Sequence, residues 1–403
     1  MFGPYSEVLR APGARAFSAA GLIARLPMSM FALGIVLAVT LSGGSYGPAG
    51  VAAGISTAGH AAASPFQARL ADRVGQRRML LPLLFGHGIA LVSLVAVVGP
   101  VAVGNAPFAL LAIAALLTGA TFPQIGALVR ARWAGLQSAR LHTAYAWESA
   151  LDEVAFVVGP MVVVTLATNV HPVAGLVAVL LFTLGGGFVF ASLRSTEPPV
   201  RQSATVGRRD PLPMVTLTWT VAAFVFMGAI FGVAELSTVA VADEFGATAA
   251  AGPVLAVFAA GSLIAGLATG AIRWKVSPRR RFVVGQAALA AAVLPLAFAG
   301  NLPLLFAAIF VAGFAIAPTL IAGFSMIQAA VPASRLTEGL AWASTAITVG
   351  AAAGSASAGP IIDRIGGSDT YLVAFACGVL ATLACLVGVS VDRPLRDDVS
   401  EPV

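Results

Sequence analysis

Twelve apolar runs follow one another along this chain of 403 residues, and each is long enough to cross a bilayer. A spanning helix needs about 20 apolar residues. The runs are 16–41, 47–67, 79–99, 107–129, 141–167, 172–193, 214–240, 251–272, 282–300, 303–325, 338–361 and 370–391. They are continuous rather than alternating with a period of two, which indicates helices and not a membrane β-barrel. The sequence therefore predicts an all-α membrane protein with twelve transmembrane helices.

The composition agrees with lipid as the solvent of this chain. Hydrophobic residues make up 59% of the sequence and charged residues only 10%, whereas an ordinary globular chain is about 25% charged. Prolines inside the runs, such as Pro123, are tolerated because neighbouring helices and hydroxyl groups satisfy the freed backbone groups. The first run is longer than the core of a signal peptide, so we expect it to remain as the first helix.

The basic residues predict the orientation in the membrane. With the N-terminus in the cytoplasm, all but two of the 23 lysines and arginines fall in cytoplasmic segments, as the positive-inside rule requires. The exceptions are Arg25, within the first run, and Arg364. The net charge of +6 thus reflects topology and not a nucleic-acid-binding face. We expect a multi-pass protein of the cytoplasmic (inner) cell membrane with both termini in the cytoplasm.

A polar segment divides the runs into two sets of six. Residues 194–213 contain four prolines and four arginines, and we predict that they form a cytoplasmic linker. The linker separates an N-terminal six-helix bundle, 1–193, from a C-terminal one, 214–403. A faint internal repeat supports two related halves, because Gly159-Pro160 in the fifth run recurs as Gly359-Pro360 in the eleventh. Repeated halves are typical of secondary transporters.

The loop between the second and third runs carries the most specific motif. It reads Arg-Leu-Ala-Asp-Arg-Val-Gly-Gln-Arg-Arg over residues 69–78. This loop resembles the signature Gly-x-x-x-Asp-Arg/Lys-x-Gly-Arg/Lys-Arg/Lys of the major facilitator superfamily of transporters. The matching residues are Asp72, Arg73, Gly75 and Arg77, whereas Ala68 and Gln76 depart from the pattern. With its two six-helix halves, the chain looks most like the sugar- and drug-efflux permeases of bacteria.

The resemblance implies a conformational role for Asp72. In the family, the matching aspartate caps a helix N-terminus in the other half and stabilises one of the two alternating-access states. A related sequence, Asp-Arg-Ile-Gly-Gly at 363–367, follows the eleventh run and therefore lies on the opposite side of the membrane, so we assign it no such role. The segment 273–281, where the family has its second copy, keeps the basic charge and lacks the acid.

Charged residues within the runs are the second group of candidates, because each costs about 2.5–3.5 kcal/mol at a helix centre. In the fifth run, Glu148 and Asp152 are four residues apart and share a helical face, whereas Glu153 points away from it. Arg25 lies at a similar depth in the first run. We predict that Arg25 pairs with Glu148 or Asp152, either as a static salt bridge or as part of the coupling machinery. Three acids against one arginine leave a carboxylate that can load and release a proton.

Glu235 is the acid of the seventh run, whose helix lines the central cavity in the family. It could bind a cationic or hydroxyl-rich cargo, carry a coupling proton, or lie at the outer rim. Gly159-Pro160 resembles the core of the family's antiporter motif, although the flanking glycines are missing. The alternative is that this pair kinks the helix or lets two helices approach.

Several classes of function are disfavoured. The phosphate-binding pattern Gly-x4-Gly-Lys-Ser/Thr needs a lysine, and the single lysine, Lys275, follows Trp274. The four histidines and two cysteines have no metal-binding spacing, and we expect neither a cofactor nor an enzyme. The sequence predicts a monomeric secondary transporter that exports a drug- or sugar-like small molecule by proton coupling. An uptake permease, or a membrane sensor or lipid-handling protein on the same scaffold, remain as alternatives.

Overall fold

The computed structural model describes residues 3–136, 141–200, 213–272, 274–332 and 335–391, and this part of the chain is helical without strands. The N-terminal half contains α1 (Gly3–Val8), α2 (Ala14–Arg25), α3 (Pro27–Leu41), α4 (Tyr46–Val74), α5 (Gln76–Ala102), α6 (Phe108–Thr121), α7 (Ile125–Leu136), α8 (Leu141–Asn169) and α9 (Ala174–Ser192). The C-terminal half contains α10 (Met214–Glu244), α11 (Ala251–Ala271), α12 (Pro278–Val293), α13 (Leu302–Gly313), α14 (Ile316–Ala330), α15 (Leu336–Ile365) and α16 (Gly367–Val391). Short 3-10 segments are η2 (Arg194–Thr196), η3 (Thr248–Ala250) and η4 (Leu294–Phe298).

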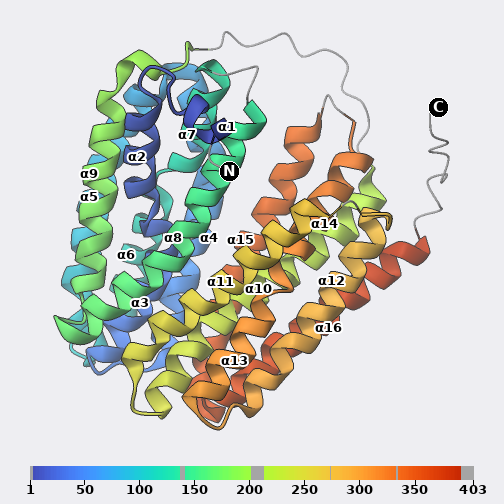
Figure 1. Ribbon diagram of the computed structural model, residues 1–403. Coiled ribbons are helices and arrows are strands. Elements are labelled where there is room, and N and C mark those ends of the chain that lie inside the picture. The colour runs from blue at the N-terminus through green and yellow to red at the C-terminus, as the bar shows by residue number, and fades with distance from the viewer. Residues whose placement is uncertain (1–2, 137–140, 201–212, 273, 333–334, 392–403) are drawn as a thin grey trace.

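These helices form two bundles of six transmembrane segments, as the sequence predicted (Figure 1). The first, fourth and tenth segments each consist of two helices, namely α2 with α3, α6 with α7, and α13 with α14. Pro123 explains the break after α6, because a proline pushes the residue before it out of the helical region, and Phe122 is extended with ψ 121°. Residues 201–212 of the expected linker lie outside the described residues.

Eleven helical segments of the described chain are long and apolar enough to cross a membrane. The twelfth long helix, α4, is less apolar because glycine, alanine and serine dominate its sequence. It packs between α6 of its own half and α15 of the other half. Two helices also run further than the sequence predicted, since α4 ends at Val74 and α7 at Leu136 rather than at 67 and 129. Both extensions contain arginines, namely Arg69 and Arg73 in α4 and Arg130 and Arg132 in α7.

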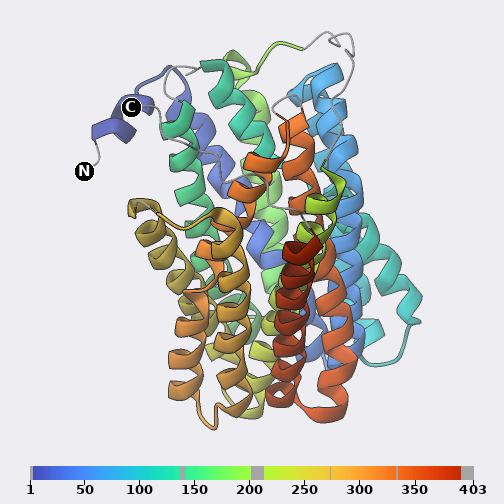
Figure 2. The same ribbon diagram turned by 90° about the vertical axis from the view of Figure 1, so that its right-hand side faces the viewer.

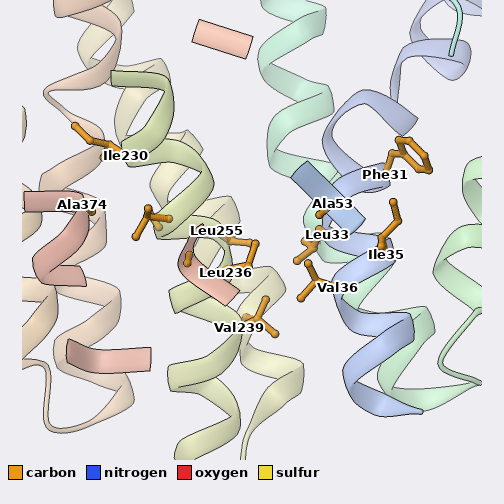
Figure 3. Packing of buried hydrophobic residues seen from close by; sticks show 14 of the residues in the cluster. Phe31, Leu33, Ile35, Val36, Ala53, Ile230, Leu236, Val239, Leu255 and Ala374 are labelled. Carbon is orange, nitrogen blue, oxygen red and sulfur yellow. The ribbon is translucent and has the colours of Figure 1, made fainter. Parts of the chain in front are cut away.

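The two halves meet at one end of the molecule. We call the end with Gly75 and Thr196 the basic end, and the end with Tyr46, Glu244 and Asp363 the acidic end. The ribbons of the halves converge at the acidic end and diverge toward the basic end, at the top of Figure 1; Figure 2 shows the same bundle turned by 90°. The hydrophobic core follows this shape: its larger cluster contains residues of both halves, and the smaller one belongs to the N-terminal half alone. Figure 3 shows Val36 of α3 facing Leu236 and Val239 of α10.

Glycines let the central helices of the C-terminal half approach closely. A Cβ atom at Gly228 of α10 would lie 2.0 Å from the carbonyl oxygen of Ile347 in α15, and one at Gly350 would lie 1.8 Å from that of Val225. Helix contacts of this kind stabilise membrane proteins because lipid supplies no hydrophobic driving force between helices. The α10–α15 pair is therefore the scaffold on which the C-terminal half is built.

Gly228→Ala should destabilise the protein by about 1–3 kcal/mol, because its methyl group overlaps a backbone oxygen that cannot move alone. Thermal unfolding in detergent measures this, with a thiol-reactive dye reporting exposure of the free and fully buried Cys385. Gly270→Ala in α11 is the control, since no atom lies within 4 Å of its added Cβ. Equal melting temperatures for the two variants would contradict the packing account.

Candidate functional site

The loop from α4 to α5 turns at a single residue. Gly75 adopts φ +94°, a conformation that favours glycine, and joins the two helices directly. The N–H of Arg77 in the first turn of α5 donates to Glu197 Oε1 at 2.9 Å. Asp72 and Arg73 are exposed, and within the described residues Asp72 has no hydrogen-bond or ion-pair partner. The structure thus holds the motif glycine in a tight turn and leaves its aspartate free.

Gln76, which departs from the family pattern, has a packing role here. Its side-chain oxygen accepts from Arg132 Nε at 2.9 Å, and its nitrogen donates to the Leu128 carbonyl at 3.1 Å. Arg132 is buried, lies over the ring of Phe190 at 3.7 Å, and donates to Thr196 Oγ1 at 2.9 Å. On the sequence alone Arg132 contributes only to orientation, but in the structure its contacts join the start of the expected linker to the N-terminal bundle.

A four-membered charge cluster lies inside the N-terminal half. Arg25 forms an ion pair with Glu148 and donates through Nη1 to Asp152 Oδ1 at 2.8 Å. Arg130 donates through Nη2 to the other oxygen of Asp152 at 2.6 Å. Arg25 and Glu148 are buried, and Asp152 is 21% exposed. Two arginines therefore match two carboxylates.

Glu148 is further satisfied by neutral donors. Its Oε1 accepts from Ser18 Oγ at 2.7 Å and from Trp133 Nε1 at 2.7 Å. Trp147 Nε1 donates in turn to Ser18 Oγ at 3.0 Å. An arginine and two further donors thus satisfy the hydrogen-bonding capacity of this buried carboxylate within the protein.

The sequence-based balance of one arginine against three acids was wrong. We placed Arg130 in a cytoplasmic segment, but α7 continues to Leu136 and turns Arg130 toward Asp152. Within the cluster no carboxylate is left over. Glu148 and Asp152 are thus better suited to a structural role than to carrying a proton.

Arg25→Met should destabilise the protein by about 3–5 kcal/mol, because it leaves Glu148 buried without its cation. Glu148→Gln strands Arg25 in the same way, and combining the two changes should restore part of the loss. Unfolding free energies of the four proteins in detergent give the coupling. Strictly additive losses would show that the pair contributes nothing.

A cavity of about 420 Å³ lies between the two halves. Its wall is formed by α3, α8, α10, α11, α14 and α15, so both bundles contribute. The lining residues are Met28, Ser29, Ala32, Leu33, Glu153, Phe156, Pro160, Phe231, Glu235, Leu255, Phe258, Ala259, Ser262, Ile316, Leu320, Phe324 and Ile347. The volume lies in the range of small-molecule binding sites, and the wall is mostly apolar and aromatic.

Two carboxylates line this cavity, one from each half. Glu153 of α8 and Glu235 of α10 are both half-buried. Neither has a hydrogen-bond or ion-pair partner among the residues that the structure describes. Glu153 lines the cavity whereas Glu148 contacts Arg25, so the two side chains lie on different faces of α8, as the helical period predicted. The structure therefore places Glu153 and Glu235 in the lining of one cavity, which neither Glu148 nor Asp152 lines.

Gly159 and Pro160 lie where α8 contacts its neighbours. A Cβ atom at Gly159 would lie 2.0 Å from Ser29 Oγ of α3, so this glycine allows the two helices to approach. Pro160 lines the cavity, and its carbonyl oxygen lies 2.8 Å from where a Cβ atom of Gly252 in α11 would stand. The pair thus sits where α8 meets both α3 and the other half.

The comparisons with known proteins agree with this architecture. The Major Facilitator Superfamily model matches residues 17–300 and 219–402, and the chain belongs to this family. No curated protein matches the sequence. Among solved structures, it is similar to a bacterial homologue of the iron transporter ferroportin in an inward-facing state (14% identity, 94% of this chain and 98% of that one, TM-score 0.71). It is also similar to an auto-inhibited POT family peptide transporter (11% identity, 97% of this chain and 98% of that one, TM-score 0.73). A third similar structure is that of the nucleoside transporter NupG (10% identity, 93% of this chain and 99% of that one, TM-score 0.70).

The solved structures establish the fold, and the family model establishes the transporter class. At such identities they carry no information on cargo, and the three proteins are named for iron, peptides and nucleosides. The chemistry of the cavity in this chain has to supply that information instead.

Proposed function

We propose that this protein is a proton-coupled secondary transporter that exports an amphipathic organic cation. The observation that carries the proposal is the pair Glu153 and Glu235, which line one cavity and have no cationic partner among the described residues. The proposed orientation places the basic end in the cytoplasm, in agreement with the distribution of arginines. In the conformation seen here, with the halves joined at the acidic end, cargo would enter from the cytoplasmic side.

The walls of the cavity favour an apolar cation over a sugar. Four phenylalanines line it: Phe156, Phe231, Phe258 and Phe324. Aromatic faces attract cations, and carboxylates supply the opposite charge. A sugar needs many hydrogen-bonding groups, but the wall offers only two serines beside the acids, and Ser29 Oγ already donates to the carbonyl of Ala155 at 2.7 Å.

Competition for the carboxylates provides the coupling. A proton that binds Glu153 or Glu235 removes the charge that attracts the cargo, so cargo leaves as the proton arrives. Because one carboxylate belongs to each half, movement of one half against the other changes their separation and their access to water. No other energy source is needed, and the sequence has no phosphate-binding loop for ATP.

Glu235→Gln and Glu153→Gln should each abolish uphill accumulation, because the neutral amide cannot exchange a proton for the cargo. Downhill exchange should persist with a raised KM, since one carboxylate still attracts the cation. The assay uses proteoliposomes with an imposed pH gradient and radiolabelled tetraphenylphosphonium. Asp369→Asn, an exposed acid of α16, is the matched control and should transport normally.

The same assay separates the alternatives. An exporter accumulates the cation on the acidic side of the membrane, whereas a proton-coupled uptake permease carries it down the proton gradient. A sensor on this scaffold would show no flux beyond that of protein-free liposomes. Uphill transport by both glutamine variants with unchanged pH dependence would exclude these carboxylates as the proton site.

A further inference from the structure

The segment after α15 repeats, at the acidic end, the sequence pattern of the motif at the basic end. Asp-Arg-Ile-Gly-Gly-Ser at 363–368 corresponds to Asp-Arg-Val-Gly-Gln-Arg at 72–77. In each case a long helix ends in Asp-Arg, and one glycine joins it to the next helix. On the sequence alone the copy at the acidic end has no assigned role.

The two copies also share their local structure. Gly366 adopts φ +86°, close to the +94° of Gly75. Glu244 Oε1 accepts the N–H of Gly367, the first residue of α16, at 2.5 Å, and Glu197 Oε1 accepts the N–H of Arg77, the second residue of α5, at 2.9 Å. A glutamate thus holds each turn from outside. The resemblance is therefore structural as well as sequential.

The two aspartates differ in what they contact. Asp363 reaches across to the other half, where its Oδ1 accepts the N–H of Tyr46 at 2.9 Å and its Oδ2 that of Gly47 at 2.7 Å. These N–H groups belong to the free N-terminus of α4, a helix of 29 residues, whose dipole favours a carboxylate. Asp72, at the other end of the same helix, is exposed and has no partner among the described residues.

Glycines bring the two helices close enough for this contact. A Cβ atom at Gly47 would lie 2.8 Å from Asp363 Oδ2, and one at Gly359 would lie 2.1 Å from the carbonyl oxygen of Tyr46. A second link between the halves lies beside it, since the hydroxyl of Tyr46 donates to Asp243 Oδ2 at 3.4 Å. The acidic end is therefore closed by backbone contact together with a carboxylate on a helix end.

We propose that Asp363 is a latch that holds the acidic end closed and that it works in opposition to Asp72. The helices α4 and α15 run antiparallel, so each aspartate ends one helix near the start of the other. Because the halves converge at one end while they diverge at the other, the two aspartates cannot both be seated, that is, bound to a helix N-terminus of the opposite half, at the same time. In the conformation seen here Asp363 is seated and Asp72 is free; in the opposite conformation Asp72 is seated at the basic end and Asp363 is released.

The proposal of a latch rests on the proposed function only in assuming alternating access, and it can be tested without any cargo. Spin labels at Asn105 and Asn301, which are exposed at the acidic end in opposite halves, report the distance between the halves by double electron–electron resonance. Native cysteines are first replaced by Cys377→Ser and Cys385→Ala. The protein is reconstituted in lipid nanodiscs.

Asp363→Ala should raise the ratio of acidic-end-open to acidic-end-closed molecules by about 2- to 30-fold, the range expected for a carboxylate on a helix end. Asp363→Asn should have a smaller effect, because an amide oxygen still accepts from the helix N-terminus. Asp72→Ala should shift the ratio the opposite way. Asp369→Ala removes an acid of the same end without touching α4, and should leave the ratio unchanged.

An unchanged ratio in Asp363→Ala, or one shifted no more than in Asp369→Ala, would overturn the latch. A shift of the same sign for Asp72→Ala and Asp363→Ala would overturn the opposition between them. If the labelled protein shows these shifts yet moves no tetraphenylphosphonium, the proposed cargo fails and the latch stands. If the protein moves the cation but the ratio of open to closed molecules is unchanged in Asp363→Ala, the latch alone fails.

Discussion

A charge in the hydrocarbon core needs a partner or access to water, and this requirement organises the molecule. Each such charge costs about 2.5–3.5 kcal/mol when it is left alone at a helix centre. In the N-terminal half the cost is offset by pairing, because Arg25 and Arg130 enclose Glu148 and Asp152. Glu153 and Glu235 have no such partner in the part of the chain that the structure describes, and they line the cavity between the halves instead. The paired acids therefore belong to the scaffold, and the unpaired acids belong to the candidate site.

Close backbone contact is the second constraint, and it determines which part of the molecule can move. Glycine contacts tie α10 to α15 within the C-terminal half, and others join α4 to α15 between the halves at the acidic end. The former contacts unite a bundle that can move as one body. The latter begin at the N-terminus of α4, where Asp363 of the opposite half accepts two backbone N–H groups, and continue along both helices. Alternating access requires this combination of rigid halves and a separable seam.

The transmembrane segments and the family could be predicted because both depend on local sequence. Apolar runs and the Asp72–Arg77 motif are visible without any tertiary contact, and helical spacing placed Glu148 and Asp152 on one face. The remaining site depends on longer-range geometry. Arg130 joins the cluster because α7 continues beyond the end of its apolar run. Glu197 caps α5 because the start of the linker folds back onto the first turn of that helix. Phe231 and Phe324 line the cavity, but their sequence context equals that of lipid-facing phenylalanines.

The central claim is that cargo and protons compete for Glu153 and Glu235. Calorimetric titration of the purified protein with tetraphenylphosphonium, in buffers of different ionisation enthalpy, measures whether cation binding expels protons. The account predicts proton release over the pH range in which the two carboxyl groups titrate, and its loss when both are changed to glutamine. Binding whose heat is independent of the buffer at every pH would contradict competition, and with it the proposed coupling.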